Sequence, residues 1–333
     1  GVVVCFGLMD DYPEATERHY AFMLEGLAEV ESQLKDRKIK FILNIGHPVE
    51  LAEELADEAS LVVCDMGYLR HMRKWRKDLA RKLDIPLVQV EDNAMVPVEV
   101  TSDKEEYAAR TIRPKIHEHL NDFAEEIHPL QVEKSTLQLK IKGEDVSKTD
   151  ALLKKLNPPA SPGRVDTFKG GTSEAKKHFK RWLENSYSNY DDDRNQPHLE
   201  HVSHMSPYLH FGQISPLWLY DQMRSKRGKN KESYVEEFVV RRELSINFVW
   251  YNKDYDSLKC LPEWAQETLE KHKKDEREKV YSKEELENAE TDDPYWNQAM
   301  KTMKERGYLH NHMRMYWGKQ ILIYTNTPQY AHK

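Results

Sequence analysis

The spacing of hydrophobic residues changes partway along this 333-residue chain. In the first third, short apolar runs alternate with longer amphipathic stretches. The apolar runs predict strands at residues 2–6, 41–45, 61–64 and 87–90, and the amphipathic stretches predict helices over 13–34 and 70–83. Strands that alternate with helices are typical of a doubly wound parallel sheet with right-handed crossovers. We therefore predict an α/β domain over residues 1–120.

A proline-rich stretch separates this part from a region with a different pattern. Residues 121–165 are charged and turn-prone and end in the sequence NPPASPG, which we interpret as the close of an interdomain linker. Beyond it, helical periodicity replaces the strand pattern. Helices are predicted over 172–187, 216–224, 233–251, 263–273 and 295–324. The second domain, residues 166–333, is therefore predicted to be all-α.

The charge argues against indiscriminate coating of nucleic acid. Lys and Arg number 50 and Asp and Glu 57, which gives a net charge of −7. The excess acid lies entirely in residues 1–165, which carry 23 basic and 30 acidic side chains, whereas residues 166–333 carry 27 of each. The charge therefore disfavours binding of nucleic acid through the first domain only.

Neither membrane insertion nor secretion is expected. The sequence has no apolar run of about 18 residues and no basic region of the kind that begins a signal peptide. The three cysteines form no CxxC pair, so a reducing compartment fits best: the cytoplasm or nucleoid, or the nucleus in a eukaryote. Glycine-rich phosphate-binding motifs are absent, so the sequence does not support an ordinary dinucleotide or nucleoside triphosphate site.

Residues 202–215 contain two serines close to a proline that can begin a helix. Ser206 directly precedes Pro207, and Ser203 lies three residues earlier. Their hydroxyls and the nearby amides are suited to receive a phosphate at a helix N-terminus. The alternative is that the serines only cap the helix, and spacing alone does not separate the two interpretations.

Residues 310–317 place four chemically distinct side chains on a predicted helix. Asn311, Arg314 and Met315 share a face, and Trp317 lies about one turn beyond Arg314. An amide, a guanidinium, a thioether and an indole together suit a planar polar ligand with an aromatic edge. The alternative is a core helix with a structural arginine.

Residues 236–247 embed charged side chains in an apolar helix. Such charges are costly unless they are paired or used for binding. Arg242 can contact a phosphate or a carboxylate through two hydrogen bonds, whereas the alternative is an internal network of salt bridges. No metal site is predicted, because the histidines at 198, 201 and 204, although close to acidic residues 191–193, match no recognised ligand spacing.

Four stretches resemble the photolyase and cryptochrome flavoproteins, specifically the class II cyclobutane pyrimidine dimer photolyases. They are 206–215 (SPYLHFGQIS), 241–248 (RREL followed by NF), 313–319 (MRMYWGK) and 101–113 (TSDKEEYAARTIR). The resemblance covers nearly the whole chain and implies a Rossmann-like antenna domain followed by a helical FAD-binding domain. It also implies that the chain begins after the family's first strand and stops before the family's C-terminal segment.

The resemblance implies FAD, bound in a bent conformation in the helical domain. A second, light-harvesting chromophore in the first domain, an 8-hydroxy-deazaflavin or a folate, is left open. The residues that match the family's FAD-binding positions are Tyr190, Ser203, Met205, Ser206, Arg242, Asn247, Asn311 and Arg314.

The implied activity is light-dependent repair of DNA that carries cyclobutane pyrimidine dimers, that is, a deoxyribodipyrimidine photo-lyase. Light-excited reduced FAD donates an electron to a dimer flipped out of the duplex, the ring splits and the electron returns. Glu237 matches an acid that hydrogen-bonds the dimer's bases, and burial is expected to keep its carboxyl protonated. Met315 matches a methionine that packs against the dimer.

Three aromatic residues and a group of basic ones complete the implied site. Trp317 and Trp296 match the inner tryptophans of the chain that photoreduces oxidised flavin. Tyr324 stands where the family commonly has the outermost tryptophan, so photoreduction is expected to end differently or to use tyrosine. The residues predicted to contact DNA are Arg241, which stands where some members place an aromatic under the dimer, and Lys226, Arg227 and Lys229 of a basic stretch.

Two rival functions accompany this prediction. One is a cryptochrome-like photoreceptor that binds FAD and signals through partner proteins without repairing DNA, and the other is an inactive fragment. Glu237 and Met315 favour repair, since a pure sensor needs neither. For the basic stretch, a solvated loop is the alternative. We expect a monomer.

Overall fold

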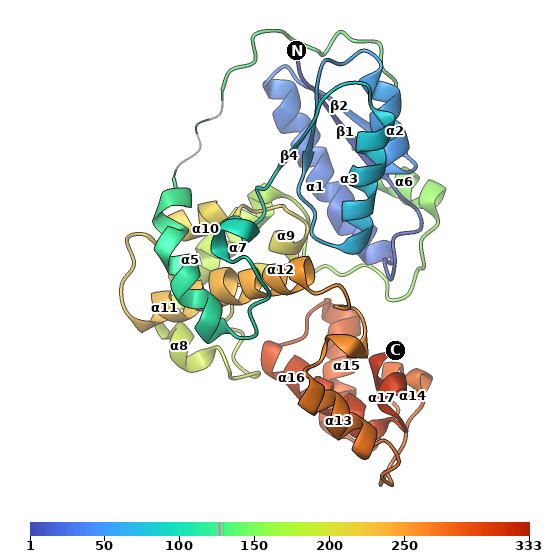
Figure 1. Ribbon diagram of the computed structural model, residues 1–333, viewed down its shortest axis with the longest axis vertical. Coiled ribbons are helices and arrows are strands. Elements are labelled where there is room, and N and C mark those ends of the chain that lie inside the picture. Colours follow the sequence, from blue (N-terminus) through green and yellow to red (C-terminus); the bar gives the residue numbers. More distant parts are fainter. Residues whose placement is uncertain (126–127, 129) are drawn as a thin grey trace.

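The four predicted strands form and pair in parallel in the computed structural model, which describes residues 1–125, 128 and 130–333 (Figure 1). Strand β1 (Val3–Leu8) pairs with β2 (Lys40–Ile45), and β3 (Val62–Asp65) pairs with β4 (Leu87–Val90). A helix joins the two strands of each pair, because parallel neighbours need a crossover connection. The predicted parallel α/β architecture is confirmed.

Helices pack beside these strands and bury apolar residues against them or against one another. Helix α1 (Glu17–Asp36) places Tyr20 and Leu24 in a core with Leu8 of β1. Helix α2 (Pro48–Ala56) contacts β1, and α3 (Arg70–Lys82) packs beside α2. The short helix α4 (Val98–Thr101) follows the last strand and leads toward the helical part.

The stretch predicted to be a linker packs against the α/β part in its second half. Helix α6 (Thr149–Leu156) adds three leucines to the core of α1, and Val146 is fully buried. The helix ends at Asn157, which adopts the left-handed conformation just before the prolines. The composition of 121–165 therefore predicts its turns but not this packing, which depends on a tertiary partner.

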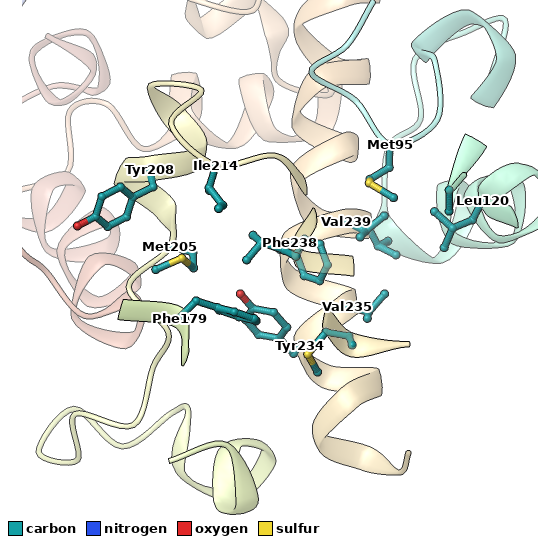
Figure 2. Packing of buried hydrophobic residues seen from close by; sticks show 14 of the residues in the cluster. Met95, Leu120, Phe179, Met205, Tyr208, Ile214, Tyr234, Val235, Phe238 and Val239 are labelled. Carbon is teal, nitrogen blue, oxygen red and sulfur yellow. The ribbon is translucent and has the colours of Figure 1, made fainter. Parts of the chain in front are cut away.

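Helix α5 (Ala109–Phe123) begins inside the predicted first domain and ends in the predicted linker, but it packs in the helical part (Figure 1). Its Leu120 shares one core with Phe179 of α7 (Thr172–Asn185) and with Val239 (Figure 2). Phe179 is fully buried and its ring contacts Trp182, Trp218 and Tyr234. This aromatic core fixes the segments that carry most of the predicted site.

The other helices of this part are short. They are η1 (Tyr187–Asn189), α8 (Tyr190–Asp193), α9 (Ser206–His210), α10 (Pro216–Met223), α11 (Lys229–Val235), η2 (Glu236–Arg241) and α12 (Arg242–Tyr251). The last three run on without a break, so the helix predicted over 233–251 forms. Its middle, η2, is a π-helix, which the periodicity does not predict.

The C-terminal region forms a separate lobe of helices (Figure 1). They are η3 (Leu258–Cys260), α13 (Glu263–Lys271), α14 (Lys283–Glu287), α15 (Pro294–Arg306), α16 (Asn311–Tyr324) and α17 (Pro328–His332). The prediction of one helix over 295–324 is wrong. The chain leaves α15 at Gly307 with a φ of 65°, a conformation that favours glycine, and α16 returns to pack around Trp296.

Arg18 of α1 ties this lobe to the α/β part. Its guanidinium donates to the carbonyl of Gly163 at 2.8 Å and to the carbonyls of Met303 and Lys304 at 3.1 and 2.5 Å. The last two carbonyls belong to the final turn of α15, where the Met303 carbonyl also accepts the Gly307 N–H at 2.9 Å. Across the described residues, the helices include none that is long and apolar enough to cross a lipid bilayer.

Candidate functional site

Three segments that the sequence predicts to bind flavin come together in the helical part. The ring of Tyr190 on α8 lies 5.5 Å from that of Tyr234 on α11, between centroids. His204, in the loop before α9, lies 4.6 Å from Tyr308, which precedes α16. Arg194, just after α8, bonds to Glu237 of η2 at 2.6 Å. Residues far apart in the sequence therefore form one cluster.

Buried polar atoms without a protein partner concentrate on these segments. Among the residues that the structure describes, seven buried side-chain polar atoms have no such partner. Five of them belong to the segments with the predicted site: His204 Nδ1, Tyr234 OH, Arg242 Nη1, His310 Nε2 and Trp317 Nε1. Because an unmade buried hydrogen bond costs about 1–3 kcal/mol, such a concentration is expected where a polar ligand binds.

The loop before α9 keeps its serine hydroxyls free of the helix. Met205 is the N-cap residue of α9, and no side chain caps this helix with a hydrogen bond. The capping alternative for Ser203 and Ser206 is therefore not what this structure shows. Met205 is 2% exposed, Ser206 is exposed, and burial lowers the pKa of His204 to about 4, so its imidazole is neutral at neutral pH.

Asn311 and Arg314 lie together on the first turn of α16. Arg314 Nη2 donates to Asn311 Oδ1 at 2.6 Å, and both residues are exposed. Burial raises the pKa of the neighbouring Tyr308 to about 12, although the charge of Arg314 acts in the opposite direction. The guanidinium thus lies near the cluster formed by Tyr308 and His204.

Arg242 faces the loop that follows β4, and Asn247 faces the loop that follows α4. Arg242 contacts Asn93 and is partly buried. Asn247 is fully buried; its Oδ1 accepts the Glu106 N–H at 2.7 Å and its Nδ2 donates to the Lys104 carbonyl at 3.0 Å. Both polar atoms of Asn247 are thus used within the protein, and the structure does not bring it to the cluster of Tyr190 and His204.

The two residues predicted to touch the dimer lie in different surroundings. Glu237 keeps 38% of its side chain exposed and is paired with Arg194. The burial expected for a protonated carboxyl is therefore not observed. Met315 is 62% exposed on α16, where its thioether is open to an incoming ligand.

The ring of Trp296 contacts those of both Trp317 and Tyr324. The rings of Trp317 and Trp296 stack with centroids 4.8 Å apart and planes inclined by 27°. The ring centroid of Tyr324 lies 6.0 Å from that of Trp296, and the two planes are inclined by 72°. Asp293, which sequence reasoning missed, accepts a hydrogen bond from the Tyr324 hydroxyl at 2.9 Å. Its position directly before Pro294, where a helix can begin, was the available signal.

The predicted DNA-contacting residues lie on the surface of the helical part. Lys226 lies over the ring of Tyr187 at 5.4 Å, and Arg227 and Lys229 are exposed. Arg241 instead bonds to Glu236 at 3.0 Å. Glu236 also forms two hydrogen bonds with Arg113 at 2.8 Å each, so the internal salt-bridge network considered for this helix exists.

Of the three histidines near the acidic run, His201 pairs with an acidic side chain and His204 packs against an aromatic ring. His201 Nδ1 contacts Asp193 Oδ2 at 2.7 Å, and His204 lies against Tyr308. Within the described ranges, no group of three or more His, Cys, Asp or Glu side chains has the geometry of a metal site. The structure thus gives His201 a role in pairing and His204 a role in packing.

Solved structures of low sequence identity share this fold. An archaeal photolyase from Sulfolobus tokodaii, described as holding two FAD molecules, superposes with a TM-score of 0.71 at 14% identity, covering 99% of this chain and 74% of that one. A cryptochrome from Synechocystis gives a TM-score of 0.73 at 12% identity, covering 96% and 68%. The predicted combination of an α/β part and a helical part is confirmed.

Sequence comparison identifies closer relatives. The family described as DNA photolyase matches residues 1–134. A deoxyribodipyrimidine photo-lyase from Methanothermobacter thermautotrophicus is 44% identical over 99% of this chain and 73% of its own length. The enzyme of that name from Potorous tridactylus is 38% identical over 98% of this chain and 62% of its own length. The chain therefore belongs to the deoxyribodipyrimidine photo-lyase family.

Proposed function

We propose that this protein is a light-driven DNA lyase of the class II type, which splits cyclobutane pyrimidine dimers with an electron from reduced FAD. The observation that carries the proposal is the contact chain Trp317–Trp296–Tyr324, whose inner member, Trp317, lies on the helix that also holds Asn311 and Arg314. A stack of tryptophans that leads outward from a flavin site suits the transfer of single electrons. Hydrolysis would need no such stack.

The chain's polar groups fit FAD. His204 Nδ1, buried without a protein partner, would offer a neutral imidazole, and the buried Tyr234 hydroxyl, with the Ser203 hydroxyl beside it, would offer a donor. Arg314 offers a guanidinium for an anionic part of the cofactor. When bound, FAD supplies the light absorption and the electron, while these residues hold and orient it.

Glu237 and the basic stretch would act on the DNA. Glu237 lies at the surface of the same cluster, and it would exchange its bond with Arg194 for the polar edge of a flipped-out base. Lys226, Arg227 and Lys229 would contact backbone phosphates, which position a duplex without reading its sequence. Met315 would provide an apolar contact.

The α/β part offers a place for the antenna chromophore. Tyr12, His47 and His71 follow β1, β2 and β3, at the strand ends where ligands bind in open parallel sheets. Trp75 lies 5.2 Å from His47 and 4.9 Å from His71, between ring centroids. We propose this aromatic group as the site of a deazaflavin or a folate. Excitation transfer to FAD after addition of each chromophore distinguishes the two.

The test of the main proposal is direct repair. Protein loaded with chemically reduced FAD is mixed with dimer-containing single-stranded DNA, and recovery of thymine absorbance is followed under blue light and in the dark. We expect recovery in the light only. Bound, reduced FAD without recovery would refute the lyase and favour the photoreceptor.

A substitution at Glu237 tests its role in that reaction. Glu237→Gln should lower the repair yield per absorbed photon while FAD remains bound, because the amide cannot supply the same proton or charge. Glu232→Gln, on the exposed face of α11, is the matched control. Loss of FAD from the Glu237→Gln protein would instead assign Glu237 to cofactor binding.

A further inference from the structure

Asp293 joins the aromatic chain to the start of α15. Its Oδ1 accepts the backbone N–H groups of Tyr295 and Trp296 at 2.9 and 3.2 Å, which caps the helix. Its Oδ2 accepts the hydroxyl of Tyr324 at 2.9 Å and also that of Tyr316. The Asp293 carboxylate therefore caps α15, the helix that carries Trp296. It also accepts a hydrogen bond from Tyr324, whose ring contacts that of Trp296.

Trp296 has no comparable acceptor for its own proton. Its side chain is 2% exposed, and its Nε1–H donates to the carbonyl of Leu286 at 2.9 Å. A backbone carbonyl is too weak a base to take a proton from an oxidised indole. A positive charge that reaches Trp296 must therefore move on or return.

Tyr324 has the proton acceptor that Trp296 lacks, and it has an electron path as well. An oxidised phenol is a very strong acid, so tyrosine loses an electron readily only when its proton has a base to move to. The hydroxyl of Tyr324 already donates to the Asp293 carboxylate, so the proton would travel along an existing hydrogen bond. Its ring contacts Trp296, so the electron has a short path.

The protonation states suit this transfer. Burial raises the pKa of Asp293, but the hydrogen bonds from Tyr316, the Trp296 N–H and Tyr324 outweigh it and lower the pKa, so the carboxyl is ionised at neutral pH. Burial and the bond to Asp293 raise the pKa of Tyr324, so its phenol keeps the proton at rest.

We propose that Tyr324 and Asp293 form the proton-coupled end of the aromatic chain. With oxidised FAD bound and excited by light, Trp317 would give up one electron, Trp296 would refill Trp317, and Tyr324 would refill Trp296. As Tyr324 gives up its electron, its phenol proton passes to Asp293, which leaves a neutral tyrosyl radical and a neutral carboxylic acid. Asp293 acts through Tyr324 as a positioning residue and proton acceptor. This inference rests on the proposed flavin photochemistry.

Two neighbouring tyrosines serve as matched controls. Tyr316 shares Asp293 Oδ2, but in the described part of the chain its ring contacts neither tryptophan. Tyr281 contacts the ring of Tyr324 at 5.3 Å, but its hydroxyl accepts the N–H of Asp292. Neither control tyrosine has both a ring contact with a tryptophan and a hydroxyl that donates to Asp293, as Tyr324 has.

The experiment is flash photolysis of protein loaded with oxidised FAD, without DNA, followed by absorption and by electron paramagnetic resonance. We expect a neutral tyrosyl radical that is lost in Tyr324→Phe and retained in Tyr316→Phe and Tyr281→Phe. Asp293→Asn, which keeps an N-cap oxygen, should form the radical at least tenfold more slowly. The rate in unsubstituted protein should fall in D₂O. An unchanged rate in Asp293→Asn, or a terminal radical on tryptophan, would overturn the proposal.

A second readout needs no flavin. In the flavin-free protein, Asp293→Asn should lower the pKa of the phenols of Tyr316 and Tyr324, because the carboxylate that raises both is gone. Absorbance titration compared with Tyr324→Phe assigns the change, and an unmoved titration would count against the contact itself. Asp293→Ser, another good cap, replaces the asparagine variant if that one does not fold. Failure of DNA repair would refute the lyase proposal. The radical kinetics and the phenol titration do not depend on repair, so they would still test the roles of Tyr324 and Asp293.

Discussion

Replacing Glu243 by glutamine should change how the stability of this protein depends on pH. Glu243 of α12 is 3% exposed, and its carboxylate accepts the N–H groups of Met95 and Val96 at 2.5 and 3.4 Å. Burial raises the pKa of Glu243 to about 7, and the neighbouring charge of Glu91 adds to this rise. The Met95 and Val96 N–H groups and Arg242 act in the opposite direction but do not cancel it.

The sign and size of the effect follow from this pKa. In the unfolded chain the carboxyl ionises near its ordinary value of 4.5, whereas the folded protein holds the proton until about pH 7. Between these values the folded state binds more protons, so the free energy of unfolding falls as pH rises. At about 1.4 kcal/mol per pH unit, the loss is about 3 kcal/mol, and it is complete above pH 7.

The assay is urea unfolding followed by circular dichroism from pH 4.5 to pH 8, for unsubstituted protein, Glu243→Gln and the exposed control Glu232→Gln. Glutamine leaves one backbone N–H poorly satisfied, a cost of about 1–3 kcal/mol that does not vary with pH. We expect the stability of Glu243→Gln, relative to the unsubstituted protein, to improve by about 3 kcal/mol across this range. Parallel pH curves would show that Glu243 is ionised in the folded state throughout and would refute the reasoning.

Three further outcomes are expected. Phe179→Ala empties the centre of the aromatic core and should cost about 3–5 kcal/mol in urea unfolding, and a loss below about 1 kcal/mol would mean that the site collapses. Neutralising Lys226, Arg227 and Lys229 together should weaken DNA binding. It should also reduce the slope of log affinity against log salt concentration by about 0.9 for each phosphate contact that is lost. An unchanged slope would mean that these residues form a solvated loop without phosphate contacts. Arg18→Gln should speed hydrogen exchange at the end of α15, measured by mass spectrometry, whereas unchanged exchange would show that its bonds to the Met303 and Lys304 carbonyls do not hold the lobe.

The strands were predictable from the sequence because each is a short apolar run between turns, and β1 to β4 lie within two residues of their predicted positions. Helix α6 was not, because eight residues next to prolines carry too little periodicity and become helical through burial against α1. The break at Gly307 was missed because apolar residues continue at helical spacing on both sides of it. In a sequence, a single glycine is compatible both with the end of a helix and with a position inside one. The fold decides between the two, because it shows whether the next helix folds back.

The candidate site, like the fold, was predictable from the sequence only in part. Trp296 and Trp317 lie on different helices, so only the family resemblance joined them before their stacking was observed. Asn247 matched a flavin-binding position, yet its amide is used by the backbone of another segment, a pairing that no local pattern encodes. Asp293 carried no motif, because its second carboxylate oxygen is used only after α16 packs against α15.

The π-helical segment η2 makes the length of its helix matter as much as its sequence. Each residue of an α-helix turns the chain by about 100°, and each residue of a π-helix turns it by less, so η2 holds one residue more than an α-helical segment of the same rotation would. Deleting one residue within Glu236–Arg241 can therefore close the segment to an α-helix and leave α12 facing as it does. Inserting a further residue has no such outlet: it would rotate α12 by about 100° and turn Glu243 away from the loop whose N–H groups it accepts.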